Sequence, residues 1–280
     1  MLIFAGHDAV IKVLTVEYAT PQILWIRFVF FSAFALTLAR RKGPLRKSTK
    51  SARPLRQIGR SLMLLLDMVL FVVAVGLLPL ADTHALIATF PLMVTALSAL
   101  ILGERVGTRR WIAVGACFVG VLLILRPGLT VLQPGSLIAL AAALAFAFYH
   151  VMTRIVTRHD SGEVSLVYVG VTGLVVTSFV VPFFWVWPTT EAWLMFAAIG
   201  IIGAVAHFLL IAALKAAPAS VLQPFNYTLL LAATVIGYFV FGQFPDLWTI
   251  IGASVIVGSG LYVVQREYSI RRQKLAAAAI

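Results

Sequence analysis

Residues 83–125 read THALIATFPLMVTALSALILGERVGTRRWIAVGACFVGVLLIL. The segment contains two apolar runs, one ending at Leu102 and one starting at Trp111, and a short charged turn lies between them. A hydrocarbon core of about 30 Å needs roughly 20 apolar residues per helix, so each run is long enough for one crossing. The segment therefore predicts two membrane-spanning helices joined by a tight turn.

The composition of the whole chain agrees with this prediction. Of its 280 residues, 61% are hydrophobic and only 11% are charged, and the mean hydropathy is +1.02. A soluble domain carries about 25% charged residues. Because the apolar runs lack the alternation of barrel strands, the sequence predicts an all-α polytopic membrane protein. Met1 leads directly into apolar sequence, so we expect no cleavable signal.

Ten apolar spans account for most of the chain. We expect them at residues 2–16, 22–39, 61–78, 84–102, 109–125, 136–154, 163–185, 192–213, 220–241 and 248–265. The loops between them are short, except for the one after the second span. Ten crossings would place both chain ends on the same side of the membrane.

Basic residues indicate which side that is. The stretch between the second and third spans carries nine cations, which places it in the cytoplasm. They are Arg40, Arg41, Lys42, Arg46, Lys47, Lys50, Arg53, Arg56 and Arg60. We therefore expect a bacterial-type inner-membrane protein with cytoplasmic N- and C-termini. Lys12 and Arg27 fall inside spans near their outer ends, where long side chains can snorkel to the interface. Since this orientation explains the net charge of +12, no nucleic-acid partner is expected.

The two halves of the chain resemble each other. Gly103, which follows the fourth span, recurs as Gly242 after the ninth, 139 positions later. Because each half has five spans, an odd number, the second half must be inverted in the membrane. We therefore expect two inverted five-helix repeats, residues 1–128 and 134–280, in one membrane domain. Inverted repeats are typical of transporters that bind substrate near the bilayer midplane.

Several short motifs suggest a family. They are Lys12, Arg27-Phe28, Pro91, Leu102 to Arg105, Trp111 and Gly120-Val121. With these motifs the chain resembles the drug/metabolite transporter superfamily and, within it, the EamA-type ten-span transporters. The resemblance implies small-molecule transport without nucleotide hydrolysis, as in bacterial exporters of aromatic amino acids and related metabolites. The second half departs from the family pattern, with Gln243 in place of Glu and Leu230 in place of Pro.

Ionisable side chains inside the spans are the first candidates for a substrate site, because they are costly in hydrocarbon and usually face a cavity or a partner. Asp8 and Asp67 could couple protons or contact a substrate amino group; the alternative is a structural carboxyl bonded to a neighbouring helix or to a histidine. The span histidines are open to the same two interpretations. The candidate substrate-binding residues are His7, Asp8, Asp67, His84, Tyr149, His150, His207, Gln223, Asn226 and Tyr227.

Two further patterns concern helix faces. The ninth span carries a polar stripe that predicts a face on the substrate path, with interhelical hydrogen bonding as the alternative. The stripe consists of Gln223, Asn226, Tyr227, Thr234 and Tyr238. Five glycines are predicted to permit close helix packing. They are Gly115, Gly120, Gly252, Gly258 and Gly260.

These patterns favour a secondary transporter that exports aromatic or apolar amino acids by alternating access. An uptake carrier for a nucleoside-like or sulfonium metabolite is the alternative, and a membrane-embedded enzyme or a channel would be of a different class. We expect no enzyme, because clustered carboxylates, nucleophile motifs and phosphate loops are missing from the sequence. No cofactor is implied, and no His/Glu spacing suggests a metal site. The expected partners are an amino acid or related metabolite, the lipid bilayer and, as a candidate coupling ion, the proton.

Overall fold

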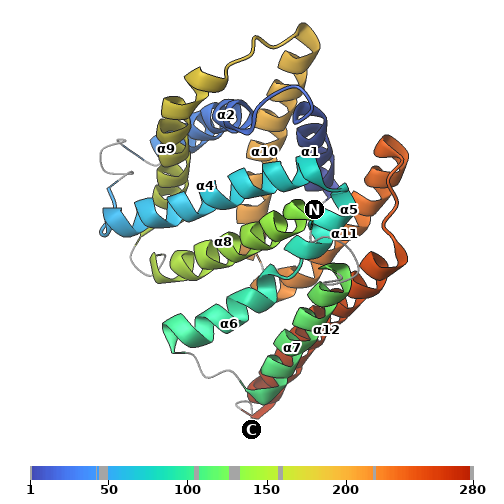
Figure 1. The fold of residues 1–280 in the computed structure, drawn as a ribbon. Coiled ribbons are helices and arrows are strands. Elements are labelled where there is room, and N and C mark those ends of the chain that lie inside the picture. The colour runs from blue at the N-terminus through green and yellow to red at the C-terminus, as the bar shows by residue number, and fades with distance from the viewer. Residues whose placement is uncertain are drawn as a thin grey trace.

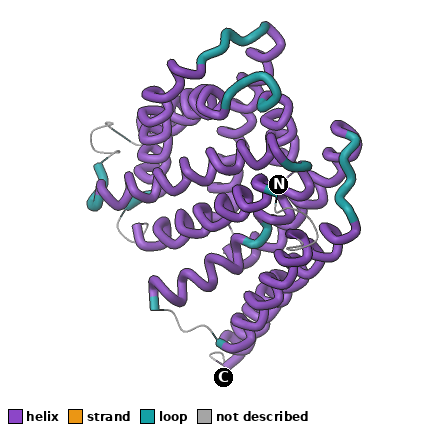
Figure 2. Tube along the Cα trace, in the orientation of Figure 1, coloured by secondary structure: helices purple, strands orange, loops and turns teal. Residues whose placement is uncertain are grey.

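The computed structural model describes residues 2–41, 43, 50–103, 107–125, 133–156, 160–216 and 219–277. Every regular element in these ranges is helical (Figure 2). The elements are α1 (Leu2–Leu14), α2 (Thr20–Arg41), α4 (Pro54–Leu77), α5 (Leu80–Ile87), α6 (Phe90–Leu102), α7 (Thr108–Leu125), α8 (Pro134–Val156), α9 (Gly162–Val180), the 3₁₀ turn η1 (Val181–Phe184), α10 (Thr190–Ala216), α11 (Ala219–Phe241) and α12 (Leu247–Ala277). Seven helical segments of the described chain are long and apolar enough to cross a membrane, so the prediction of an all-α polytopic membrane protein is confirmed.

The predicted spans agree with these helices except in three places: within the fourth span, at the start of the third, and at the end of the tenth, where α12 continues to Ala277. The fourth span is broken: α5 ends at Ile87, a turn follows, and α6 begins at Phe90 with Pro91 in its first turn. Proline is tolerated in the first turn of a helix, where its missing N–H has no intrahelical partner to lose. The third span begins earlier than predicted, at Pro54. Arg60, which we assigned to the cytoplasmic loop, is therefore a helical residue, and only 2% of its surface is exposed.

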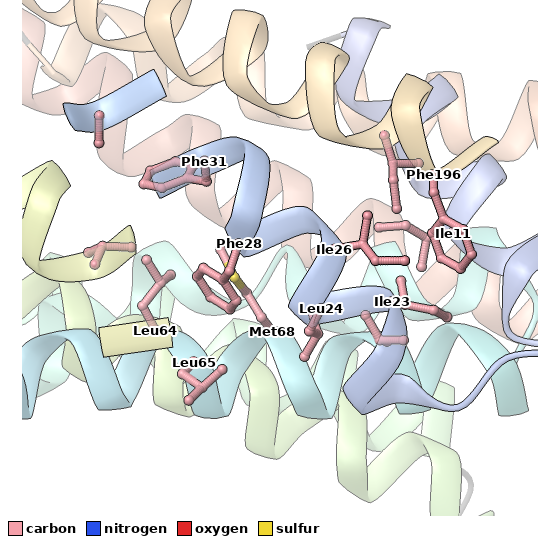
Figure 3. Close-up of a cluster of buried hydrophobic side chains, with 14 of the residues drawn as sticks. Ile11, Ile23, Leu24, Ile26, Phe28, Phe31, Leu64, Leu65, Met68 and Phe196 are labelled. Atoms are coloured by element: carbon pink, nitrogen blue, oxygen red, sulfur yellow. The ribbon is translucent and has the colours of Figure 1, made fainter. Parts of the chain in front are cut away.

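The helices pack into one connected bundle. In Figure 1, α4 and α8 lie side by side across the middle, with α2 and α9 above them and α7 and α12 together below. The largest apolar cluster joins α2 to α4, where Phe28 packs near Leu64 and Met68 (Figure 3). This arrangement leaves α4 in contact with α8, α9, α1 and α2, so residues on its faces lie inside the bundle.

Packing contacts recur in the two halves of the chain. The pair α4–α9 has its counterpart in α10–α2, and the pair α6–α7 in α11–α12. Gly103 after α6 and Gly242 after α11 both adopt the left-handed backbone conformation, with φ of 65° and 64°. These recurrences are compatible with the predicted repeats, 1–128 and 134–280, and both the repeats and their inversion in the membrane stay predictions.

Connecting segments are tied together at both ends of α2. At its N-terminal end, Tyr18 Oη accepts a hydrogen bond from the Thr189 backbone N–H at 3.3 Å. Beyond its C-terminal end, Asp160 accepts from Ser51 Oγ at 2.5 Å and from the Ala52 N–H at 2.8 Å. The 22 residues of α2 extend for about 33 Å, so these ties lie near opposite faces of a bilayer. Tyr18 and Asp160 are 142 positions apart, which again agrees with a repeat.

Candidate functional site

Three ionisable side chains from α1 and α5 meet inside the bundle, and we call them the histidine–aspartate cluster. His7 Nδ1 donates a hydrogen bond to Asp8 Oδ1 at 2.9 Å, and His84 Nε2 lies 3.4 Å from Asp8 Oδ2. All three residues are buried, with 1%, 7% and 4% of their surfaces exposed. The carboxylate thus has a nitrogen near each oxygen, which is what a charge far from water requires.

Arg27 of α2 and Asp67 of α4 lie beside this cluster. Both are half-buried, and the charge of Arg27 interacts with the charges of Asp8 and Asp67. A Cβ atom added to Gly203 of α10 would stand 3.2 Å from His7 Nε2 and 4.0 Å from Arg27 Nε, so α1, α2 and α10 converge here. Within the described part of the chain, neither Arg27 nor Asp67 forms a hydrogen bond or an ion pair with a protein group.

Four rings on α6 and α8 form a second group, the aromatic cluster: Phe90, Phe146, Tyr149 and His150. Phe90 stacks on His150 with ring centres 5.5 Å apart, and Phe146 meets the same imidazole edge-on at 4.6 Å. The three α8 residues share one helical face, because they are three and four positions apart. The Arg60 guanidinium lies over the Tyr149 ring, 5.2 Å from its centre, as in a cation–π contact.

One face of α4 connects the two clusters. Asp67 and Phe71 lie seven and eleven positions after Arg60, which places all three close to one line along the helix. Arg60 contacts Tyr149 at one end of this line, and at the other end the ring of Phe71 lies 5.7 Å from that of His84. Seven residues rise by about 10 Å along a helix axis. The α4 face thus separates an aromatic end from a charged end by that distance.

The structure brings six of the ten predicted site residues into these surroundings. They are His7, Asp8, Asp67 and His84 at the charged end, and Tyr149 and His150 at the aromatic end. The side chains of three others, His207, Gln223 and Asn226, lie outside the described part of the chain. Within these groups no three His, Cys, Asp or Glu residues form a set that could hold a metal ion; the same is true of the rest of the described chain.

Tyr227, the tenth predicted residue, lies elsewhere. It is 7% exposed, and its hydroxyl fills the space that a side chain at Gly260 of α12 would need. Thr234 bonds the Leu230 carbonyl of its own helix at 2.9 Å, and Tyr238 is 53% exposed. That the α11 stripe faces a substrate path stays a prediction for these members. They pack against α12, the helix backbone and the outer surface.

A cavity of about 440 Å³ lies on α11 and is separate from both clusters. It is lined by Thr228, Leu231, Ala232, Val235 and Ile236. Leu231 is 67% exposed and Val235 is 55% exposed, so the cavity opens on the outer surface of the bundle. An uncharged, outward-facing hollow of this kind would be filled by lipid chains, and we do not assign it to substrate.

Lys12 bonds the end of a neighbouring helix. Its ammonium donates to the carbonyls of Val75 at 2.7 Å and Leu78 at 2.5 Å, at the C-terminal end of α4. The last carbonyls of a helix lack intrahelical donors, and a cation there also interacts favourably with the helix dipole. This cap holds α1 against the end of α4, and the expected snorkelling of Lys12 stays a prediction.

We expect Lys12→Met to lower the free energy of unfolding by about 1–3 kcal/mol, because two helix-end carbonyls lose a charged donor. Thermal unfolding of the purified protein in detergent measures this loss. Lys50→Met, at an exposed coil position, is the matched control and should leave the melting temperature unchanged. Equal melting temperatures for the Lys12 variant and the wild type would show that the cap contributes nothing.

Apolar helices around a buried charged and aromatic interior define the class: a polytopic membrane protein. The chain belongs to the EamA-like transporter family, whose model matches residues 1–126 and again residues 133–265.

Curated relatives and a solved structure agree with that assignment. The chain is 25% identical over 271 residues to the S-adenosylmethionine uptake transporter of Rickettsia bellii, covering 97% of this chain and 92% of the relative. It is 34% identical over 196 residues to the riboflavin transporter of Vibrio cholerae, covering 68% of this chain and 64% of the relative. A crystal structure titled "Crystal structure of protein" matches with a TM-score of 0.65 at 21% identity, covering 92% of this chain and 93% of the other, which shows a shared fold.

Proposed function

We propose that this protein is a secondary carrier that takes up a nucleoside-like or sulfonium metabolite across a bacterial-type inner membrane. The observation that carries the proposal is the α4 face, which presents an aromatic end at Arg60 and Tyr149 and, two turns away, the Asp67 carboxyl beside Arg27. A nucleoside-like solute has a flat heterocycle that stacks on aromatic side chains, and a polar part that needs charged or hydrogen-bonding groups.

The relatives support uptake of this kind of solute. Their names specify S-adenosylmethionine uptake and riboflavin transport, and both compounds contain flat nitrogen heterocycles. Export of aromatic or apolar amino acids, our first interpretation of the sequence, is now the second candidate, because it rests on resemblance alone. Two inverted repeats moving against each other would give alternating access, with Asp8 or Asp67 as candidate proton-coupling groups.

Counterflow in proteoliposomes tests the proposal. Vesicles loaded with unlabelled S-adenosylmethionine, riboflavin, adenosine or an aromatic amino acid are diluted into the corresponding labelled compound. We expect saturable exchange of the nucleoside-like compounds, and stimulation by an imposed pH gradient if protons are coupled. Exchange of amino acids alone would refute the uptake proposal and restore the export interpretation. Conductance that rises linearly with concentration would indicate a channel.

We expect Phe146→Leu to raise the KM for a nucleoside-like substrate roughly two- to tenfold, because an aromatic contact contributes about 0.5–1.5 kcal/mol beyond its buried area. Phe146 contacts every other ring of the aromatic cluster, and leucine preserves most of its volume. Phe179→Leu, on the 74% exposed surface of α9, is the matched control. Similar KM values for the two variants would remove the aromatic cluster from the site.

A further inference from the structure

We infer that Arg27 and Asp67 form a subsite for a zwitterionic amino-acid head group, with Arg27 binding its carboxylate and Asp67 its ammonium. The inference rests on the proposed function and narrows its substrate class. The solute would carry an α-amino acid at one end and a flat heterocycle at the other, the heterocycle lying against the aromatic cluster.

Arg27 and Asp67 have opposite charges and no partner among the described side chains. Arg27 and Asp67 are both half-buried inside the bundle, and their charges interact. Yet among the described residues no acceptor bonds Arg27 and no donor bonds Asp67, and their atoms are absent from the set of fully buried, unpartnered polar atoms. Their polar atoms therefore keep some accessible surface. Opposite charges in hydrocarbon normally pair, because an isolated buried charge is costly. A ligand with one charge of each sign would pair both.

The neighbouring carboxylate, Asp8, already has partners. Asp8 has His7 on one oxygen and His84 near the other, so it is not the free anion of the site. Its charge, together with that of Asp67, faces Arg27. From α10, Gly203 brings only backbone close to the guanidinium, because a Cβ there would stand 4.0 Å from Arg27 Nε.

The distance between the two ends of the site also fits such a solute. Asp67 lies two turns along α4 from Arg60, which marks the aromatic cluster, so about 10 Å separates the two ends. A nucleoside that carries an amino-acid tail spans such a separation, whereas a free amino acid fills only the charged end. The guanidinium fork suits a carboxylate, which it can bind with two parallel hydrogen bonds.

Inhibition of labelled S-adenosylmethionine counterflow by a matched set of analogues tests the assignment. In wild-type proteoliposomes we expect removal of the carboxylate (decarboxylated S-adenosylmethionine) to weaken inhibition roughly ten- to hundredfold, the value of a charge-assisted hydrogen bond. We expect removal of the amino group to do the same. Arg27→Gln should abolish only the carboxylate preference, and Asp67→Asn only the amino preference. Arg27→Lys keeps the charge and should keep part of the preference.

Arg109→Gln and Glu191→Gln, exposed at the starts of α7 and α10, are the matched controls and should keep both preferences. The assignment is overturned if a variant is inhibited more weakly by all analogues to the same extent. It is also overturned if the variant still discriminates between the analogues as the wild type does. If wild-type protein moves no nucleoside, the proposed function fails by itself. The subsite is then tested by thermal shifts with phenylalanine, phenethylamine and phenylpropionate, where equal shifts for all three would overturn it.

Discussion

Replacing Asp8 with alanine will lower the free energy of unfolding by about 3–5 kcal/mol and abolish uptake, because removing one member of a buried charged group leaves the others without partners. Asp8 is the only acceptor that the structure gives to His7 Nδ1, and it is the nearest charge to His84 among the described residues. Both histidines are almost fully buried, so water cannot replace the lost carboxylate. Thermal unfolding in detergent and uptake into proteoliposomes measure the two effects.

The Asp8→Asn variant distinguishes an effect on folding from an effect on transport. The amide keeps an oxygen that can accept from His7, so we expect most of the folded protein to be retained while the charge is lost. Asp246→Ala is the control, because it also removes a carboxylate that stabilises a helix. Asp246 is exposed and accepts a hydrogen bond from the Thr249 N–H at the start of α12. Loss of such a cap costs about 1 kcal/mol. An Asp8→Ala variant no less stable than this control would show that the histidine–aspartate cluster is not stabilising.

The course of the chain through the bilayer could be predicted from the sequence, whereas the contacts of the charged side chains could not. Hydropathy depends on the length of each apolar run, which the bilayer fixes, so most of the ten spans were placed within a few residues. A cation near the end of a run looks the same whether it reaches the lipid interface or a neighbouring helix. For that reason Lys12 and Arg27 were expected to snorkel, and Arg60 was assigned to a loop.

Two periodic signals in the sequence could have located the site more closely. Arg60, Asp67 and Phe71 follow a helical repeat within a span, and Phe146 precedes Tyr149 and His150 on one face. Neither pattern indicates its partner helix, because that depends on tertiary packing. The pairing of Asp8 with His84 joins two spans that are far apart in the sequence, so it could be seen only in the structure.

The glycines predicted to pack closely also show that the sequence does not indicate which residues face another helix. All five predicted glycines lie in apolar spans, but the structure gives close neighbours only to Gly120, Gly252 and Gly260. The prediction is wrong for Gly115 and Gly258, where an added Cβ would meet nothing within 4 Å. Spacing along a helix cannot tell a glycine that faces a neighbouring backbone from one that faces lipid, and this difference leads to a prediction with a control on the same helix.

We expect Gly120→Val to destabilise the protein by about 3 kcal/mol, the upper end of the usual cost of overpacking. At the crossing of α7 and α12, a Cβ on Gly120 would stand 2.8 Å from the Gly252 carbonyl oxygen, and one on Gly252 would stand 2.6 Å from that of Gly120. Backbone cannot move aside as a flexible side chain can, so the two helices must separate.

Gly115→Ala on α7 supplies the control for this prediction. Alanine stabilises a helix by about 1 kcal/mol more than glycine does. Since nothing obstructs a methyl group at Gly115, the melting temperature should stay the same or rise. Thermal unfolding of both variants in one detergent compares them directly. Equal losses would mean that α7 tolerates no substitution anywhere. A loss at Gly120 alone would show that contact between the two backbones holds α12, the last helix of the second half, against α7, the last helix of the first.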